Sequence, residues 1–364
     1  MDRGTIGSET VKKAEPRDPL LDGFRAYAVG LVILGHAMAY RFADQIEPLG
    51  MFGYQIRRLS GPLADLGVYL FFAISGYIIT SLLLREEKRR GRISLQAFYL
   101  RRSFRILPPL LVYLLVVFLL SMNGLITSPT NELPRALFTC NLLECDWYIA
   151  HTWSLAVEEQ FYLIWPVIFL FTAKQIRTKC SVIGFVGLLS AFAVLGWTFH
   201  SNALSFACIA GGVCIALQPN WREFLATRCS PYLWIFAGVL AVLGPFILGN
   251  WLAGLIMPLL VLILIFGSYS ISWLHPFLVA RPVQKIAAMS YSLYLWQQLF
   301  LGREPLGPAI TLLMLPCVAL LSMYLIERPF IRLSHRLSRS ITTSSLPSPI
   351  LGYPAENQSN GKPK

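Results

Sequence analysis

A basic residue and a histidine stand eleven positions apart within one strongly apolar segment, at Arg25 and His36. Eleven residues make almost three turns of an α-helix, so the two side chains are expected on the same helix face. At ~1.5 Å per residue, His36 would lie about 16 Å farther along the helix than Arg25, close to the middle of a bilayer. A titratable side chain is costly at that depth, so His36 indicates a functional site, and a satisfied structural histidine is the alternative.

Two arginines at positions i and i+3, Arg102 and Arg105, follow a basic run and precede another apolar segment. On a helix they project from one face. Guanidinium groups bind phosphate oxygens through paired hydrogen bonds, so these two could hold a nucleotide-bearing ligand such as a coenzyme A thioester. The alternative is that they only anchor the helix to anionic membrane lipid, which is enough to explain the other basic residues of the run.

Two adjacent carboxylates, Glu158 and Glu159, lie about one turn inside a further apolar segment. They are expensive to bury in a membrane, and adjacent helical residues point ~100° apart. One of them could orient His36 or help to deprotonate an acceptor hydroxyl. The alternative is a structural ion pair, or a pair that reaches the membrane surface. Four other histidines fall in loops or at helix ends and are expected to face solvent: His151, His200, His275 and His335.

A polar stripe lies late in the chain, where Tyr291, Tyr294 and Gln298 share a helix face and Gln297 is offset from it. These side chains could line a cavity or form hydrogen bonds between helices. The sequence contains no G-x-S-x-G, P-loop, G-x-G-x-x-G or H-x-x-x-x-D arrangement. Serine hydrolases, NTP-driven pumps and soluble-type glycerolipid acyltransferases are therefore not indicated.

The overall composition predicts an all-α polytopic membrane protein. Of the 364 residues, 55% are hydrophobic and 14% are charged, whereas soluble domains average about 25% charged residues. The first twenty residues lack the apolar core of a secretory signal, so the N-terminus is expected in the cytoplasm. Apolar windows of ~17–22 residues predict about ten transmembrane helices, near residues 24–41, 65–84, 106–122, 154–173, 181–199, 203–217, 232–248, 252–272, 286–301 and 308–326.

The positive charge follows the predicted membrane orientation, in which both chain ends are cytoplasmic. The outer loops carry five of the 31 Lys and Arg residues, namely Arg41, Arg57, Arg58, Arg135 and Arg303. This is the positive-inside pattern, so the net charge of +12 does not indicate nucleic-acid binding. Residues 1–20 form a cytoplasmic segment, and residues 336–364, which are rich in Ser, Thr and Pro, are predicted to be a disordered cytoplasmic tail.

Seven cysteines include no Cys/His cluster with metal-ligand spacing, so no metal site is expected. Cys140 and Cys145 share the predicted outer loop 123–153, where a disulfide is chemically permitted and two free thiols are the plainer alternative. This loop and residues 42–64 are the largest predicted outer segments, and we expect them to shape the site of the acceptor.

Six short segments stand in a fixed order along the chain, at Leu21–Ala26 with His36, Gly67–Gly76, Tyr99–Pro109, Trp153–Tyr162, Ser290–Trp296 and Glu327–Pro329. Together they resemble the acyltransferase 3 family of membrane O-acyltransferases, whose members acetylate polysaccharides and other glycosylated molecules. The resemblance implies a ten-helix membrane domain over residues 21–335 in the cell (inner or plasma) membrane. Such a domain moves an acyl group, usually acetyl, from cytosolic acyl-CoA to a hydroxyl of a cell-surface, secreted or lipid-linked glycan.

The family's Arg-x10-His pair falls on Arg25 and His36, and its Arg-x-x-Arg donor motif falls on Arg102 and Arg105. The resemblance thus implies that these arginines bind the acyl-CoA co-substrate, with no tightly bound cofactor, and that His36 is the catalytic base. The family's Trp-Ser-Leu-x-x-Glu segment ends on Glu158, so Glu158 or Glu159 would assist His36, and a covalent acyl-histidine remains an alternative. Many members have a second histidine where this chain has Gln297, which can hydrogen-bond a substrate but does not titrate.

A second function fits the same residues. His36, Glu158 and Glu159 could form the proton relay of a proton-coupled transporter or of a flippase for a glycan or lipid-linked sugar. Transporters of this kind tend to show repeated halves with corresponding broken helices, and the sequence shows no internal repeat. The acyltransferase is therefore the favoured interpretation.

Overall fold

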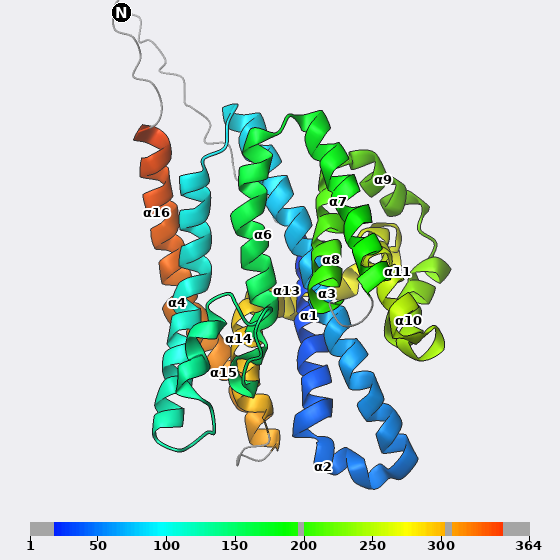
Figure 1. The fold of residues 1–364 in the computed structure, drawn as a ribbon, viewed down its shortest axis with the longest axis vertical. Helices are drawn as coiled ribbons and strands as arrows, with labels where there is room; N and C mark the ends of the chain where they lie inside the picture. Colours follow the sequence, from blue (N-terminus) through cyan, green and yellow to red (C-terminus); the bar gives the residue numbers. More distant parts are fainter. Residues whose placement is uncertain (1–17, 196–199, 303–307, 345–364) are drawn as a thin grey trace, which may run out of the picture.

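The computed structural model describes residues 18–195, 200–302 and 308–344, and every regular element in these ranges is helical (Figure 1). The α-helices are α1 (Pro19–His36), α2 (Ala43–Ile46), α3 (Gly50–Arg90), α4 (Leu95–Met122), α5 (Trp147–Ala150), α6 (Thr152–Phe171), α7 (Lys174–Leu195), α8 (His200–Leu217), α9 (Pro219–Arg228), α10 (Pro231–Ile247), α11 (Gly249–Gly267), α12 (His275–Val279), α13 (Arg281–Ala288), α14 (Ser290–Leu301), α15 (Pro308–Ser322) and α16 (Arg328–Ser344).

In the described part of the chain, seven helical segments have the length and composition to cross a membrane. Eight are obtained if α8 and α9, which meet at a bend of 97°, count as one span. Each of the ten predicted spans overlaps at least one helix, but α10 with 17 residues and α14 with 12 residues are short. The protein is therefore a multi-pass helical membrane protein, and the number of ten spans stays a prediction.

The length of α3 departs most from the sequence-based expectation. We expected a loop at 42–64, but α3 runs without a break for 41 residues and contains Pro62. Between α1 and α3 lie only α2 and two short turns, the π-helix η1 (Ala37–Arg41) and the 3₁₀-helix η2 (Glu47–Leu49). The helices α1 and α3 pack along one another, and a Cβ on Gly35 would lie 2.5 Å from the carbonyl oxygen of Ser60, so this contact includes the last residues of the expected loop.

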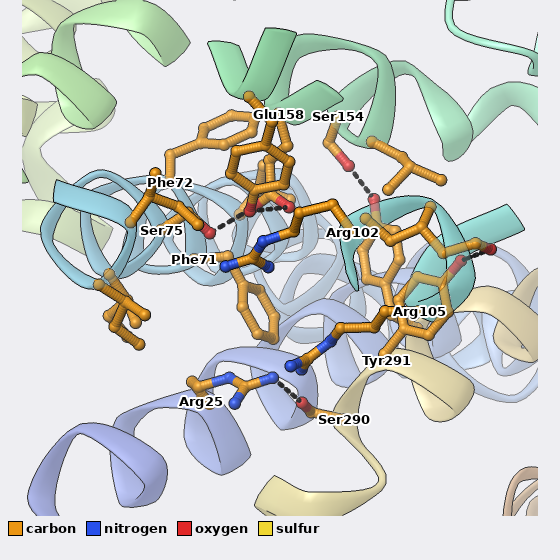
Figure 2. A pocket seen from close by; sticks show the side chains of 18 residues that line it. Arg25, Phe71, Phe72, Ser75, Arg102, Arg105, Ser154, Glu158, Ser290 and Tyr291 are labelled. Carbon is orange, nitrogen blue, oxygen red and sulfur yellow. Dashed lines mark hydrogen bonds between the residues drawn. The ribbon is translucent and has the colours of Figure 1, made fainter. Parts of the chain in front are cut away.

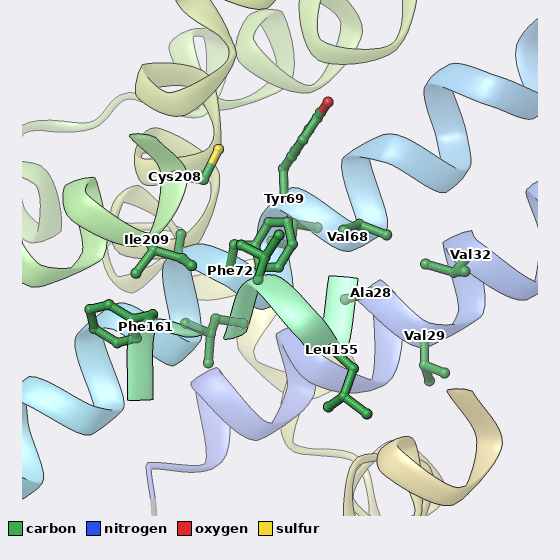
Figure 3. Packing of buried hydrophobic residues seen from close by; sticks show 14 of the residues in the cluster. Ala28, Val29, Val32, Val68, Tyr69, Phe72, Leu155, Phe161, Cys208 and Ile209 are labelled. Carbon is green, nitrogen blue, oxygen red and sulfur yellow. The ribbon is translucent and has the colours of Figure 1, made fainter. Parts of the chain in front are cut away.

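Close approach of α3 and α8 depends on two glycines. A Cβ on Gly76 would lie 2.1 Å from the carbonyl oxygen of Ile209, and a Cβ on Gly212 would lie 2.0 Å from that of Ala73. Small residues of this kind let helix backbones approach closely in membrane proteins. Buried apolar side chains such as Phe72 and Ile209 fill the surrounding space (Figure 3).

The two ends of the bundle carry different segments. In Figure 1 the end of α3, the beginning of α4 and the end of α16 lie at the upper end, whereas α2 lies at the lower end. The basic run 85–105 is thus at the opposite end from the turn that follows α1. This arrangement agrees with the predicted topology, although the orientation in the membrane itself stays a prediction.

The connection between α4 and α5 is held by several cross-links. Cys140 and Cys145, for which the sequence left two alternatives, are joined by a disulfide. Asp146 accepts a hydrogen bond from Ser128 Oγ at 2.8 Å and another from the backbone N–H of Tyr148 at 3.1 Å, so it also caps α5. These contacts fix where α5 begins.

The last helix extends beyond the boundary expected from composition. We placed the start of a disordered tail at residue 336, but α16 continues to Ser344. It packs against α4, where the rings of Phe104 and Phe330 lie 6.2 Å apart, and Ser334 and Ser338 are buried. Packing thus outweighs the Ser-rich composition. The remaining tail, 345–364, and residues 1–17 lie outside the described residues.

Candidate active site

A cavity of about 130 Å³ lies where α1, α3, α4, α6 and α14 meet (Figure 2). Five helices that are far apart in the sequence each place polar side chains on it, and apolar side chains such as Phe71 and Phe72 complete the wall. We call it the arginine cavity. Its polar lining is Arg25, Ser75, Arg102, Arg105, Ser154, Glu158, Tyr162, Ser290, Tyr291 and Tyr294.

Three guanidinium groups point into the arginine cavity (Figure 2). Arg25 Nη2 donates a hydrogen bond to Ser290 Oγ at 3.3 Å. The guanidinium of Arg102 rests over the ring of Tyr162, 4.8 Å from its centroid. Arg105 lies close enough to Arg25 for the two charges to repel each other. Such a concentration of positive charge around a small cavity favours an anionic ligand.

Glu158 is the one carboxylate among the residues that line the cavity. It accepts hydrogen bonds from Ser75 Oγ at 2.7 Å and from Tyr162 Oη at 3.1 Å. It is also attracted by Arg102 and Arg25. These contacts fix the carboxylate on the arginine side of α6, and Asp22 and Glu327, which do not line the cavity, add negative charge next to Arg25.

The sequence-based expectation that Glu158 or Glu159 orients His36 is not met by the geometry. No hydrogen bond among the described residues joins either carboxylate to His36. Glu158 faces α3 and α4, and Oε1 of Glu159 is buried without a hydrogen-bond partner in the described part of the chain. The reason is that His151, at the start of α6, lies near His36, whereas Glu158 lies about two turns farther along α6, near Arg25.

A larger groove of about 650 Å³ adjoins the arginine cavity, and Arg102 and Arg105 line both. The groove lies between the end of α3, the beginning of α4 and α16, at the end of the bundle predicted to be cytoplasmic. We call it the basic groove. Its other charged or titratable lining residues are Arg85, Glu86, Arg89, Arg90, Arg101, His335 and Arg339.

Glu327 is a buried carboxylate to which the sequence assigned no role. It lies at the end of the second π-helix, η7 (Met323–Glu327), and accepts a hydrogen bond from Ser292 Oγ of α14. It is attracted by both Arg105 and Arg25. Glu327 therefore adds a carboxylate next to Arg105 and Arg25 without lining the arginine cavity itself. Its only signal in the sequence was its place in the Glu-Arg-Pro segment of the family pattern.

His36 is the last residue of α1 and does not line the arginine cavity. It lies beside the amide of Gln297, and its ring centroid is 6.0 Å from that of Trp147. The helix widens to the π-helix η1 directly after His36, and single-turn π-helices are frequent at functional sites.

The prediction that Arg25 and His36 share a helix face agrees with the packing of α1. Both residues lie against α14, because Arg25 bonds Ser290 and His36 lies beside Gln297. Tyr291 and Tyr294 lie between these two contacts and line the cavity. The face shared by Arg25 and His36 therefore runs along the polar stripe of α14, from the arginine cavity towards the other end of the bundle.

The polar stripe of α14 fulfils both functions that the sequence left open. Tyr291 Oη donates to the carbonyl oxygen of Ile106 at 2.9 Å, and Tyr294 Oη is 2.9 Å from the carbonyl oxygen of His151. Both rings also line the arginine cavity. The hydroxyl groups thus form hydrogen bonds with other segments of the chain, while the rings form part of the cavity wall.

The expectation that His151 faces solvent was wrong, because this side chain is only 3% exposed. Its Nε2 is 3.0 Å from the carbonyl oxygen of Leu295, and its ring packs against those of Tyr113 and Tyr294. The helix-end position suggested exposure, but α14 and α4 cover it. His275 is half-buried, His335 is exposed in the basic groove, and the side chain of His200 lies outside the described set.

Comparison with known proteins adds a family context to this geometry. A family model described as Acyltransferase domain, Acyl_transf_3, matches residues 18–337. Peptidoglycan O-acetyltransferase OatA of Listeria monocytogenes is 28% identical over 320 residues, which are 76% of this chain and 48% of that protein. O-acetyltransferase OatA of Staphylococcus aureus strain NCTC 8325 is 34% identical over 179 residues, which are 44% of this chain and 26% of that protein. The chain thus spans at most about half of these relatives, and no solved structure matches it.

Proposed function

Since this chain belongs to the acyltransferase 3 family, we propose that it is a membrane O-acetyltransferase. The acyl group comes from acyl-CoA, most simply acetyl-CoA, at the cytoplasmic face. The acceptor is a hydroxyl of a glycan or a lipid-linked sugar that reaches the site from the outer face of the cell (inner or plasma) membrane. The names of the two OatA relatives, one of them a peptidoglycan O-acetyltransferase, support the acetyl group and the glycan acceptor.

The observation that carries this proposal is that the basic groove and the arginine cavity share two lining arginines. Arg102 and Arg105 line both spaces, so a ligand that enters the groove meets them before it reaches Arg25. The groove presents several arginines to the phosphates of coenzyme A, which arginine binds through paired hydrogen bonds. The narrower cavity, with apolar walls, then accepts the uncharged pantetheine arm.

In this proposal the pantetheine arm extends along α1, from Arg25 towards His36. The two residues are eleven positions apart on α1, about 16 Å at the helical rise, and the polar stripe of α14 follows the same line. An extended arm anchored at Arg102 and Arg105 would run along this line and bring the thioester towards His36. Holding both reactants in place in this way lowers the entropic part of the barrier.

The reaction at His36 is a direct transfer. The acceptor hydroxyl oxygen attacks the carbonyl carbon of the thioester while His36 removes the hydroxyl proton. The carbon–sulfur bond breaks, the ester is formed, and the coenzyme A thiolate leaves and takes up the proton from His36. In this proposal Glu158 acts indirectly, because it holds Arg102 and Tyr162 in place around the donor. Glu159 takes no direct part in the transfer.

The donor site is tested by thermal unfolding of the purified protein with acetyl-CoA and with acetyl-pantetheine, which lacks the nucleotide. A ligand at a hundred times its Kd stabilises a protein by about 2.7 kcal/mol. We expect acetyl-CoA to raise the Tm of the wild type and acetyl-pantetheine to leave it almost unchanged. Arg102→Ala should abolish the rise, because it removes a phosphate contact.

Arg332→Ala is the matched control, because Arg332 is an exposed arginine of α16 that does not line the basic groove. It should keep the full rise in Tm with acetyl-CoA. A wild-type protein that acetyl-CoA does not stabilise, or an Arg102→Ala variant stabilised as strongly as the wild type, would contradict the proposed donor site.

A further inference from the structure

A group of buried polar side chains surrounds His36, outside the arginine cavity. His36 lies beside Gln297 and within electrostatic range of His151, and Gln298 follows Gln297 on α14. Trp147 closes the group, since its ring contacts His36 and its Nε1 donates a hydrogen bond to the carbonyl oxygen of Gln298 at 3.1 Å. We call His36, His151, Gln297 and Gln298 the outer polar cluster.

The outer polar cluster contains several buried atoms without a hydrogen-bond partner among the described residues. These are both amide atoms of Gln297, Oε1 of Gln298, Nδ1 of His151 and Nδ1 of His36. Gln297 is 0% exposed, Gln298 2% and His151 3%. Buried polar atoms are nearly always paired in folded proteins, and leaving them unpaired costs stability. So many in one place indicate a site that is completed by a polar ligand or by the water that the ligand displaces.

The donors and acceptors of the cluster define the chemistry of that ligand. Nε2 of His151 lies 3.0 Å from the carbonyl oxygen of Leu295. A carbonyl oxygen only accepts, so Nε2 carries the proton and Nδ1 is left as a bare acceptor. Gln297 offers one amide donor and one amide acceptor. A hydroxyl group, which donates one hydrogen bond and accepts others, matches this set, whereas a phosphate or a thioester carbonyl would only accept.

We propose that His151 and Gln297 bind the acceptor and hold its reacting hydroxyl against His36. The reacting hydroxyl donates its proton to His36 and its oxygen accepts from the Gln297 amide, while Nδ1 of His151 accepts from a neighbouring hydroxyl of the same acceptor. Both are thus substrate-binding residues, and this inference rests on the function proposed above.

The other end of the bundle carries a groove next to this cluster. A groove lined by Tyr40, Tyr54, Arg57, Arg58 and Glu47 lies between η1 and the beginning of α3. Tyr40 belongs to this groove and its ring lies 4.1 Å from that of Trp147, which in turn contacts His36. Aromatic faces with charged groups between them suit a carbohydrate, which has apolar ring faces and many hydroxyl groups. The acceptor is therefore a sugar that enters past Tyr40 and Trp147.

The test uses membrane vesicles from cells that naturally make the protein, with the native copy deleted and each variant supplied in its place. Labelled acetyl-CoA is titrated, and label in the glycan fraction is measured. His151→Gln keeps an amide near the position of Nε2 for the Leu295 carbonyl but loses Nδ1, and Gln297→Met keeps the shape but loses both polar atoms. For each we expect kcat to fall about tenfold or more while the KM for acetyl-CoA stays within about twofold.

Two conservative variants should keep more activity. His151→Asn places an acceptor oxygen near the position of Nδ1, and Gln297→His keeps a polar side chain at this position. Both variants should therefore retain more of the wild-type kcat than His151→Gln and Gln297→Met. The matched control is His275→Gln, because Nε2 of His275 also lies 3.0 Å from a backbone carbonyl, that of Ser268, but far from this site in the sequence and fold. It should leave kcat unchanged.

The outcomes separate this inference from the proposed function. Unchanged kcat in folded His151→Gln and Gln297→Met proteins, with transfer by the wild type, would overturn the assignment of the hydroxyl site alone. A raised KM for acetyl-CoA with unchanged kcat would place these residues at the donor instead and would also overturn it. Absence of label transfer by the wild type in its native membranes would overturn both the inference and the proposed function.

Discussion

His36 and Arg25 lie on one face of α1 but serve different ends of the site. Arg25 lines the arginine cavity and bonds Ser290, whereas His36 lies one level farther on, beside Gln297. The separation follows from the eleven-residue spacing. In the proposed reaction, one helix would bind the donor at one point and carry the base at another, so that the phosphates stay far from the reacting carbonyl group.

A substitution of His36 should therefore affect chemistry without affecting donor binding. General acid–base catalysis contributes roughly 10²- to 10⁴-fold to a rate, so His36→Ala should lower kcat by at least about 100-fold. The rise in Tm with acetyl-CoA should remain, because Arg102 and Arg105 are untouched. Initial rates and thermal unfolding of the same preparation check both parts. Full transfer activity in the folded variant would exclude His36 as the base.

The sequence predicted local relations between residues well. Arg102 and Arg105 project together because an i, i+3 spacing on a helix leaves no other arrangement, and both line the same two spaces. It could not predict which helix faces His36. The partner proved to be Gln297 rather than Glu158 or Glu159, and that choice depends on how α1, α6 and α14 pack.

At the scale of helices, α3 is the element around which the others are arranged. It contacts α1, α6, α8, α10 and α11, and its Ser75 holds Glu158 in the arginine cavity. Gly76, the next residue, allows α8 to approach so closely that a Cβ would meet a backbone oxygen. Ser75, which lines the arginine cavity, and Gly76, which allows the close contact with α8, are therefore adjacent residues of α3.

The same substitution at two glycines of α3 should have opposite effects. Gly76→Ala would place its Cβ 2.1 Å from the Ile209 carbonyl oxygen, and overpacking of this kind typically costs about 1–3 kcal/mol. A Cβ on Gly61 would meet nothing within 4 Å, so Gly61→Ala should be neutral or stabilise by about 0.5–1 kcal/mol. Thermal unfolding in detergent measures both. Equal Tm values for the two variants would refute the close contact.

Helix positions were predictable from hydropathy, but helix ends were not. Each predicted span overlaps a helix, because apolar length alone decides that much. The extra length of α3 before residue 65 and of α16 after residue 336 comes from packing against α1 and α4. The 97° bend between α8 and α9 lies directly after the predicted span 203–217, and α9 itself was not among the predicted spans.

Across the whole molecule, the proposed reaction joins two openings at opposite ends of the bundle. The basic groove opens between the end of α3 and α16, and the groove with Tyr40 and Tyr54 opens near α2. In Figure 1, α2 and the end of α3 lie at opposite ends of the bundle. The arginine cavity, the α14 stripe and the outer polar cluster lie between them. Charge asymmetry in the sequence predicted which end is cytoplasmic, but the connection between the ends required the folded arrangement of five helices.

The most direct test of this two-sided site is the sidedness of acetyl-CoA use in sealed membrane vesicles. Inside-out and right-side-out vesicles carrying the same amount of protein receive labelled acetyl-CoA in the external medium, and label in the glycan fraction is followed over time. We predict incorporation in inside-out vesicles, where the basic groove faces the medium, and none in right-side-out vesicles until they are permeabilised. Equal incorporation by both kinds of intact vesicle, or incorporation by right-side-out vesicles alone, would contradict the account.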